Sequence, residues 1–270
     1  MSDTPLEAVL RRDRAVVMVA LVVIAVLAWA YVLWLAADMD LPGMDMPGMD
    51  MTGTAMGMPG FRAWASADFA FIFMMWAVMM IGMMTPSVAP MLLLYAGVGR
   101  KAEASGRPMA STVWFFTGYL TVWIAFSLVA TAAQWLLARL LLLSPAMATN
   151  STVFGGLVLI AAGLYQWTPM KAVCLRQCQA PIAFLARRGG FRSDPLGAFR
   201  LGIDHGAYCL GCCWTLMALL FVGGVMNVLW IAGIAALVLL EKTVPTGQLV
   251  PRVSGVMMTA VGVWLVAGAL

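Results

Sequence analysis

Long apolar runs separated by short polar segments dominate the chain. Seven such runs cover residues 15–36, 66–84 (running on past Pro86 toward 98), 111–137, 153–170, 206–223, 227–240 and 254–269. A run of about 20 apolar residues is long enough to cross the roughly 30 Å hydrocarbon core of a bilayer. Because hydrocarbon offers no partner for backbone N–H and C=O groups, each run is predicted to form a helix.

Composition supports the same class of protein. The 270 residues are 63% hydrophobic and only 10% charged, with a mean hydropathy of +0.94. A soluble domain carries about 25% charged residues. The sequence therefore predicts an all-α, polytopic bundle of about seven transmembrane helices.

The basic residues indicate which ends of the helices face the cytoplasm, where Lys and Arg are enriched. With the N-terminus inside, fourteen of the sixteen fall on the cytoplasmic side: Arg11, Arg12, Arg14, Arg100, Lys101, Arg107, Lys171, Arg176, Arg187, Arg188, Arg192, Arg200, Lys242 and Arg252. Only Arg62 and Arg139 fall outside. The predicted orientation is N-in, C-out, and the net charge of +4 reflects this topology, so no nucleic-acid partner is expected.

Three regions follow from this topology. Residues 1–36 form an N-terminal tail and an anchor helix, whose apolar core of about 22 residues exceeds the 7–15 of a secretory signal, so we expect it to be retained. Residues 37–64 form an external loop. Residues 65–270 form a membrane domain of six helices. Asp68, Asp204 and Glu241 stand at span ends, where interfacial positions are expected.

The external loop repeats the unit Met-Asp-x-Pro/Thr-Gly in "MDLPGMDMPGMDMTG". Proline and glycine in each repeat disfavour regular structure, so a flexible loop is expected. Thioethers are soft ligands that favour Cu(I). The candidate ligands here are Met39, Met44, Met46, Met49, Met51, Met56 and Met58. Copper or silver capture is one interpretation, and a low-complexity spacer is the alternative.

The second span is also rich in methionine. "FMMWAVMMIGMMTPSVAPM" places seven of the chain's 23 methionines in or beside one helix. Positions 76, 79, 80, 83 and 87 share a face that would carry stacked sulfur atoms, and the candidate ligands of this span are Met79, Met80, Met83 and Met84. Pro86 and Pro90 interrupt the helical hydrogen bonds near the inner end. Ordinary helix packing explains such methionines equally well, because methionine is a common filler of apolar interiors.

All five cysteines fall in two clusters, predicted at the cytoplasmic ends of the fourth and fifth spans. "KAVCLRQC" gives Cys174 and Cys178, which share a helix face if the fourth span continues inward. "DHGAYCLGCC" gives His205, Cys209, Cys212 and Cys213, whose spacing is that of one helical stripe.

Thiols in a reducing compartment suggest metal binding or redox chemistry rather than structural disulfides. Cu(I) takes few soft ligands, whereas zinc would take four in a tetrahedral site. Lys171 and Arg176 are the cations expected near the thiols. Cys209-Leu-Gly-Cys212 is also a C-x-x-C motif, which leaves thiol–disulfide exchange open, and simple packing of small apolar side chains remains a further alternative.

Three stretches carry a family resemblance: "WAVMMIGMMTPSVAPMLLLYA", "AAGLYQWTPMKAVCLRQCQAP" and "DHGAYCLGCCWTLMALLFVGGVMNVLWIAGIAALVLLEKTVP". They resemble a bacterial domain-of-unknown-function family described as predicted metal-binding integral membrane proteins, some labelled copper chaperones. The resemblance covers roughly residues 65–270 and leaves out the methionine repeat. It implies a multi-pass protein of the bacterial inner membrane and makes the four cysteine–histidine stripe residues, with Cys174 and Cys178, candidate ligands.

The working hypothesis is a non-enzymatic membrane protein that binds Cu(I) for transport, delivery or homeostasis. No P-loop and no D-K-T-G phosphorylation motif is present. Outer methionines would collect the metal and the inner cysteines and histidine would bind it most tightly, an order similar to that of the eukaryotic copper-uptake family, though on a different fold. Partners would be the metal ion and a cuproenzyme or soluble copper carrier. The rivals are a thiol oxidoreductase using Cys209 and Cys212, an assembly factor without net flux, and a protein with a structural zinc site.

Overall fold

The computed structural model describes residues 5–39, 64–106, 110–140, 142, 147–149, 151–244 and 247–269. Within these residues the elements are ten α-helices. They are α1 (Pro5–Met39), α2 (Ser66–Ala104), α3 (Thr112–Arg139), α4 (Thr152–Tyr165), α5 (Pro169–Gln179), α6 (Pro181–Arg187), α7 (Pro195–Ala218), α8 (Leu220–Gly223), α9 (Val228–Thr243) and α10 (Leu249–Ala267). The expected all-α class is confirmed.

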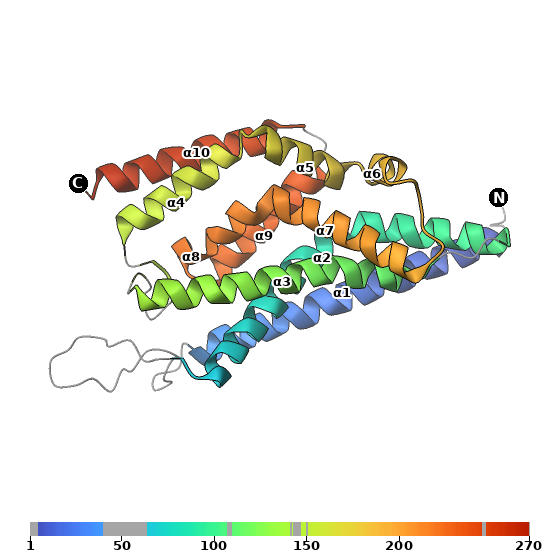
Figure 1. Cartoon of the computed structure of the whole chain (residues 1–270), viewed down its shortest axis with the longest axis horizontal. Coiled ribbons are helices and arrows are strands. Elements are labelled where there is room, and N and C mark those ends of the chain that lie inside the picture. The colour runs from blue at the N-terminus through green and yellow to red at the C-terminus, as the bar shows by residue number, and fades with distance from the viewer. Residues whose placement is uncertain are drawn as a thin grey trace.

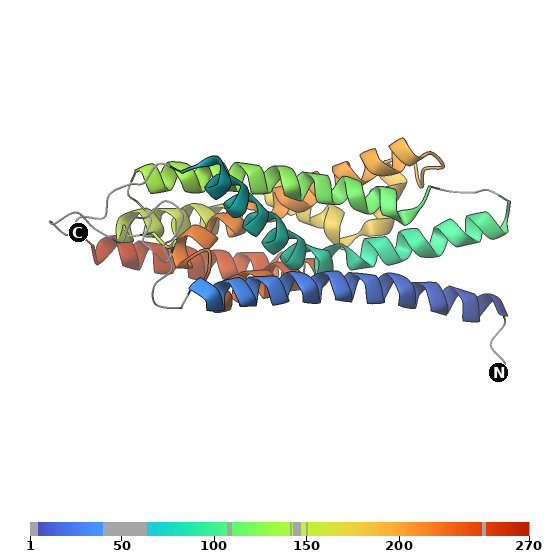
Figure 2. The ribbon, with the colours of Figure 1, turned by 90° about the horizontal axis from the view of Figure 1, so that it is seen from below.

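The long helices lie along one axis of the molecule and alternate in direction (Figures 1 and 2). The end of α2, the start of α3, all of α6 and the start of α7 lie at the end where α1 begins, and α10 finishes at the opposite end. Nine of the fourteen basic residues expected inside lie at the start of α1, at the end of α2, or between the end of α6 and the start of α7: Arg11, Arg12, Arg14, Arg100, Lys101, Arg187, Arg188, Arg192 and Arg200. The arrangement is the one that the N-in orientation requires, and the orientation itself stays a prediction.

Five helices in the described chain are long and apolar enough to cross a membrane, or six if α4 and α5 form one broken span. The prediction of seven spans is therefore supported only as five to six. The missing span is α9, which has 16 residues, fewer than the roughly 20 that a bilayer requires. One side of α9 packs against α2, α5 and α7, whereas Leu229 and Leu240 of the same helix are exposed.

The fourth predicted span does not continue straight inward. The chain bends by 66° between α4 and α5. Thr168 is extended, with φ −71° and ψ 145°, and its side chain accepts a hydrogen bond from the Lys171 backbone N–H. The residue before a proline disfavours helical backbone, and proline suits the first turn of a new helix, so Thr168-Pro169 ends one helix and starts the next.

The fifth span begins earlier than its apolar run. Asp194 caps α7 by accepting a hydrogen bond from the Gly197 N–H, and Pro195 follows at the first helical position. These are strong helix-start residues. His205 consequently lies eleven residues into the helix, where the apolar run 206–223 had placed it at a span end.

Close contact between α3 and α7 holds the thiol-bearing helix in the interior. A Cβ atom at Gly202 would overlap the carbonyl oxygen of Phe115, and one at Gly118 would overlap that of Phe199. Small residues allow membrane helices to approach closely in this way. On the other side α2 packs against α3 and α9 and changes direction partway along its length (Figure 2), with Pro86 and Pro90 inside the helix.

Candidate metal centre

The cysteine–histidine stripe of α7 faces the interior, as its spacing predicted. His205, Cys209, Cys212 and Cys213 are at most 3% exposed. The thiols of Cys212 and Cys213 both donate to the backbone carbonyl of Cys209, at 3.1 Å and 3.0 Å. Three thiols thus occupy adjacent positions on one buried face.

The short helix α5 brings the second cysteine cluster against the first. Helix α5 packs against α7, and Cys178 and Cys174 contact the buried core that contains Cys209, Cys212 and Cys213. A Cβ atom at Gly211 would lie 2.9 Å from the Sγ atom of Cys174, so glycine is needed for this approach. All five cysteines are free thiols. The bend after α4 therefore joins two clusters that are about 30 residues apart in sequence.

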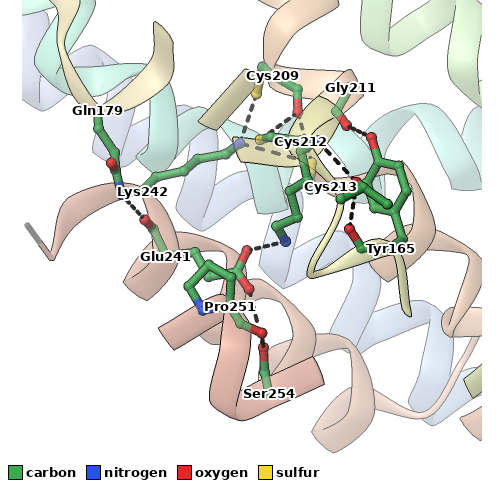
Figure 3. Close-up of polar contacts among 12 residues, drawn as sticks. Tyr165, Gln179, Cys209, Gly211, Cys212, Cys213, Glu241, Lys242, Pro251 and Ser254 are labelled. Atoms are coloured by element: carbon green, nitrogen blue, oxygen red, sulfur yellow. Dashed lines mark hydrogen bonds and ion pairs between the residues drawn. The ribbon is translucent and has the colours of Figure 1, made fainter. Parts of the chain in front are cut away.

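Lys242 is the cation at the thiol cluster, and the hydropathy pattern had assigned it to an inner loop. It lies in the last turn of α9 and is only 7% exposed. Its Nζ atom lies 2.8 Å from the Sγ atom of Cys209 (Figure 3). The Tyr119 hydroxyl lies 3.1 Å from the same sulfur. Lys171 and Arg176, the cations expected beside the thiols, make other contacts.

Lys171 forms a buried ion pair with Glu241, with 2.7 Å between Nζ and Oε2. Glu241 is 2% exposed, so its carboxylate faces the protein interior, and its interfacial position stays a prediction. The Ser254 hydroxyl lies 3.5 Å from its other carboxylate oxygen, and the Gln179 side chain donates to its backbone carbonyl (Figure 3). This pair joins α5 to α9 beside the thiols.

His205 shares the stripe but has aromatic surroundings. Its ring centroid lies 5.1 Å from that of Phe184, 5.8 Å from that of Phe115 and 6.0 Å from that of Tyr119. Its Nδ1 atom has no hydrogen-bond partner among the described residues. Within the same part of the chain, no group of three or more His, Cys, Asp or Glu side chains converges on a position for a metal ion. The six predicted cysteine and histidine ligands lie in the same region of the protein, but no three of them are arranged to coordinate one metal ion.

The methionines of α2 are buried but divide between two surroundings. Met79 and Met83 line a small space against Ala28 of α1 and Ile231 of α9. Met84 instead lies at the thiol cluster, where its Sδ atom is 3.9 Å from the Nζ atom of Lys242. Met80 is fully buried. Met79 and Met83 thus lie on one face, as their spacing predicted, whereas Met84 has different neighbours; the role of these methionines as ligands stays a prediction.

Of the methionines predicted to lie outside the membrane, the structure describes only the first, Met39. Met39 is the last residue of α1. Met44, Met46, Met49, Met51, Met56 and Met58 lie outside the residues that the structure describes. Their role as ligands stays a prediction.

The candidate metal ligands in the interior of the bundle are soft donors. Thiol and thioether sulfur surround a region that also holds one ammonium group, and such ligands favour Cu(I) over harder cations. In comparisons with known proteins, no curated protein and no solved structure matches the chain. A family model described as copper chaperone matches residues 73–265, the part that contains α5, α7, α9 and most of α2. The match covers well over half of the sequence, and the chain therefore belongs to the copper chaperone family.

Proposed function

We propose that this protein binds Cu(I) at the buried thiols of α5 and α7 and hands it on within the membrane, without enzymatic turnover. The observation that carries the proposal is the packing of α5, with Cys174 and Cys178, against the three buried thiols of α7 inside an apolar bundle. Buried thiols alone are ordinary small apolar side chains. The position of two of them, Cys209 and Cys213, beside the Lys242 ammonium group is unusual, because buried charges require a compensating partner.

The family description supports copper as the metal, and the ligand set supports the Cu(I) state. Zinc in a structural site would require four converging ligands. The described His, Cys, Asp and Glu side chains offer no such group of even three. Cu(I) is satisfied by fewer soft donors. The structural zinc alternative is correspondingly weaker.

The thiol oxidoreductase alternative would use Cys209 and Cys212. Both side chains are at most 2% exposed, whereas reactive cysteines of redox proteins are partly accessible to their substrates. The burial of this pair favours metal binding over disulfide exchange with a partner.

The external methionine repeat completes the proposed route. It would collect copper from outside and release it toward α2, with the inner thiols as the tightest site. A cuproenzyme or a soluble copper carrier would receive the metal, and the proposed location is the bacterial inner membrane.

Copper handling in cells tests this function. A strain producing the protein is expected to differ in cell-associated copper and copper tolerance from the same strain producing Cys209→Ser/Cys212→Ser at equal abundance, because serine oxygen is a poor Cu(I) ligand. Deleting residues 39–58 is expected to give a partial effect. Equal copper content and tolerance in all strains would contradict the proposal, and an effect of the cysteines alone would make the loop a spacer.

A further inference from the structure

The Lys242 side chain ends inside a pocket of sulfur atoms. Its Nζ atom lies 2.8 Å from the Sγ atom of Cys209, 4.0 Å from that of Cys213 and 3.9 Å from the Sδ atom of Met84. The Ser87 hydroxyl, 3.4 Å away, is the remaining polar neighbour of this nitrogen. One positively charged atom thus lies within 4.0 Å of two thiols of α7, drawn in Figure 3, and of a thioether of α2.

An ammonium group is a poor match for such a pocket. It is strongly hydrated, and its preferred partners are oxygen atoms of carboxylates, phosphates or water. Burial removes that hydration, and sulfur is a weak hydrogen-bond acceptor. Lys171, the other buried lysine of the described chain, shows the usual solution, because it pairs with the carboxylate of Glu241. Lys242 has no carboxylate partner in the described structure, and its surroundings suit a soft cation better than an ammonium.

We propose that Lys242 holds the position of the metal in the metal-free protein, and that Cu(I) binds by taking its place among Cys209, Cys213 and Met84. This inference rests on the proposed function and names its ligands. It also explains why no three His, Cys, Asp or Glu side chains converge. Two of the three donors are cysteines, the third is a methionine, and an ammonium nitrogen separates them.

The exchange moves one cation out of the pocket as another enters, and the ammonium stays protonated throughout. Cysteine binds a metal as the thiolate, so a proton still held by Cys209 or Cys213 leaves for water as Cu(I) binds. The three sulfur atoms are soft donors, which suit Cu(I) and Ag(I). Zn(II) would require a fourth ligand for its tetrahedral site, so the pocket would favour Cu(I) and Ag(I) over Zn(II).

Lys242 has a route out of the pocket. It lies in the last turn of α9, one residue before the helix ends. Its four-carbon stem is flexible, and lysines near the ends of membrane helices extend their charged groups to the aqueous interface. A change of side-chain rotamer at the helix end would carry the ammonium group from the sulfur atoms toward water.

Amine labelling of the full-length protein in detergent tests the exchange. A water-soluble acylating reagent is applied under anaerobic, reducing conditions with and without saturating Ag(I), and peptide mass spectrometry follows each lysine. Labelling of Lys242 is expected to rise severalfold when Ag(I) binds. Labelling of Lys171 is expected to stay low in both states, because its ion pair with Glu241 is not part of the pocket. Saturating Zn(II) is expected to leave Lys242 unlabelled.

A pair of methionine variants tests the ligand set. Met84→Leu is expected to weaken Ag(I) binding about tenfold. Met83→Leu, in the same helix but facing Ala28 and Ile231, is expected to bind as the unmodified protein does. Both changes preserve volume and apolar character.

The outcomes separate the two proposals. If the protein binds Ag(I) and Cu(I) while Lys242 stays unlabelled, or if Met84→Leu and Met83→Leu behave alike, the exchange is wrong and the proposed function stands. Labelling of Lys242 that rises with Zn(II) as much as with Ag(I) would overturn the predicted preference for soft monovalent ions. If neither Ag(I) nor Cu(I) binds, both proposals fail.

Discussion

Replacing Cys209 and Cys213 together with serine is expected to lower the affinity for Cu(I) by roughly a thousandfold, about 4 kcal/mol of binding free energy. The change removes the two thiols nearest to the Lys242 ammonium group and substitutes harder oxygen donors for them. The measurement is a competition titration of the reduced protein against a chromophoric Cu(I) chelator.

Loss of folding is a separate outcome that the variant is designed to avoid. The Cys213 thiol donates to the Cys209 carbonyl, and a serine hydroxyl can donate to the same oxygen. Thr215→Val is the matched control, because Thr215 is buried on the same helix and its hydroxyl has no hydrogen-bond partner among the described residues. A cysteine variant that binds Cu(I) as tightly as this control, with equal thermal stability, would remove the two thiols from the proposed site.

Glu241→Ala is expected to lower the free energy of unfolding by about 3–5 kcal/mol, since it leaves the Lys171 ammonium group buried without its partner. Lys171 and Glu241 are 1% and 2% exposed and join α5 to α9. Lys171→Met/Glu241→Leu, which removes both charges, is expected to recover most of the loss, because a well-packed apolar pair often replaces a buried ion pair without cost. Thermal unfolding in a fixed detergent measures all three proteins.

The Arg188–Asp204 pair provides the comparison. Its side chains are 35% and 40% exposed, and breaking a solvent-exposed pair costs at most about 1 kcal/mol. Asp204→Ala should therefore change stability far less than Glu241→Ala. Similar losses in the two single variants, or no recovery in the double variant, would show that burial of the Lys171–Glu241 pair is not what makes it important.

Much of the architecture could be predicted from hydropathy and helical spacing. The apolar runs predicted an all-α membrane bundle because a bilayer requires a definite length of apolar helix. The i, i+4, i+7 and i+8 spacing of the α7 stripe predicted a common face for His205 and the three cysteines, and all four are buried. Such inferences depend on local periodicity, which a single sequence contains.

The positions that could not be predicted depend on packing between helices. Glu241 and Lys242 follow an apolar run. The hydropathy pattern does not tell whether charged residues at the end of such a run are exposed to water or buried between helices. The division of the α2 methionines, with Met84 at the thiols and Met83 at α1, depends on how α2 is rotated against its neighbours. The apolar runs also overlooked the starts of α5 and α7, which lie at Thr168-Pro169 and Asp194-Pro195.

The most direct test of the central claim is metal analysis of the protein purified anaerobically from cells grown with copper. We expect copper bound in the Cu(I) state, and we expect that copper to be absent from Cys209→Ser/Cys212→Ser. Zinc at one ion per chain would instead support a structural site, and a disulfide between Cys209 and Cys212 would support the oxidoreductase. Purified protein without copper, or equal copper in both proteins, would contradict the claim that the buried thiols bind Cu(I).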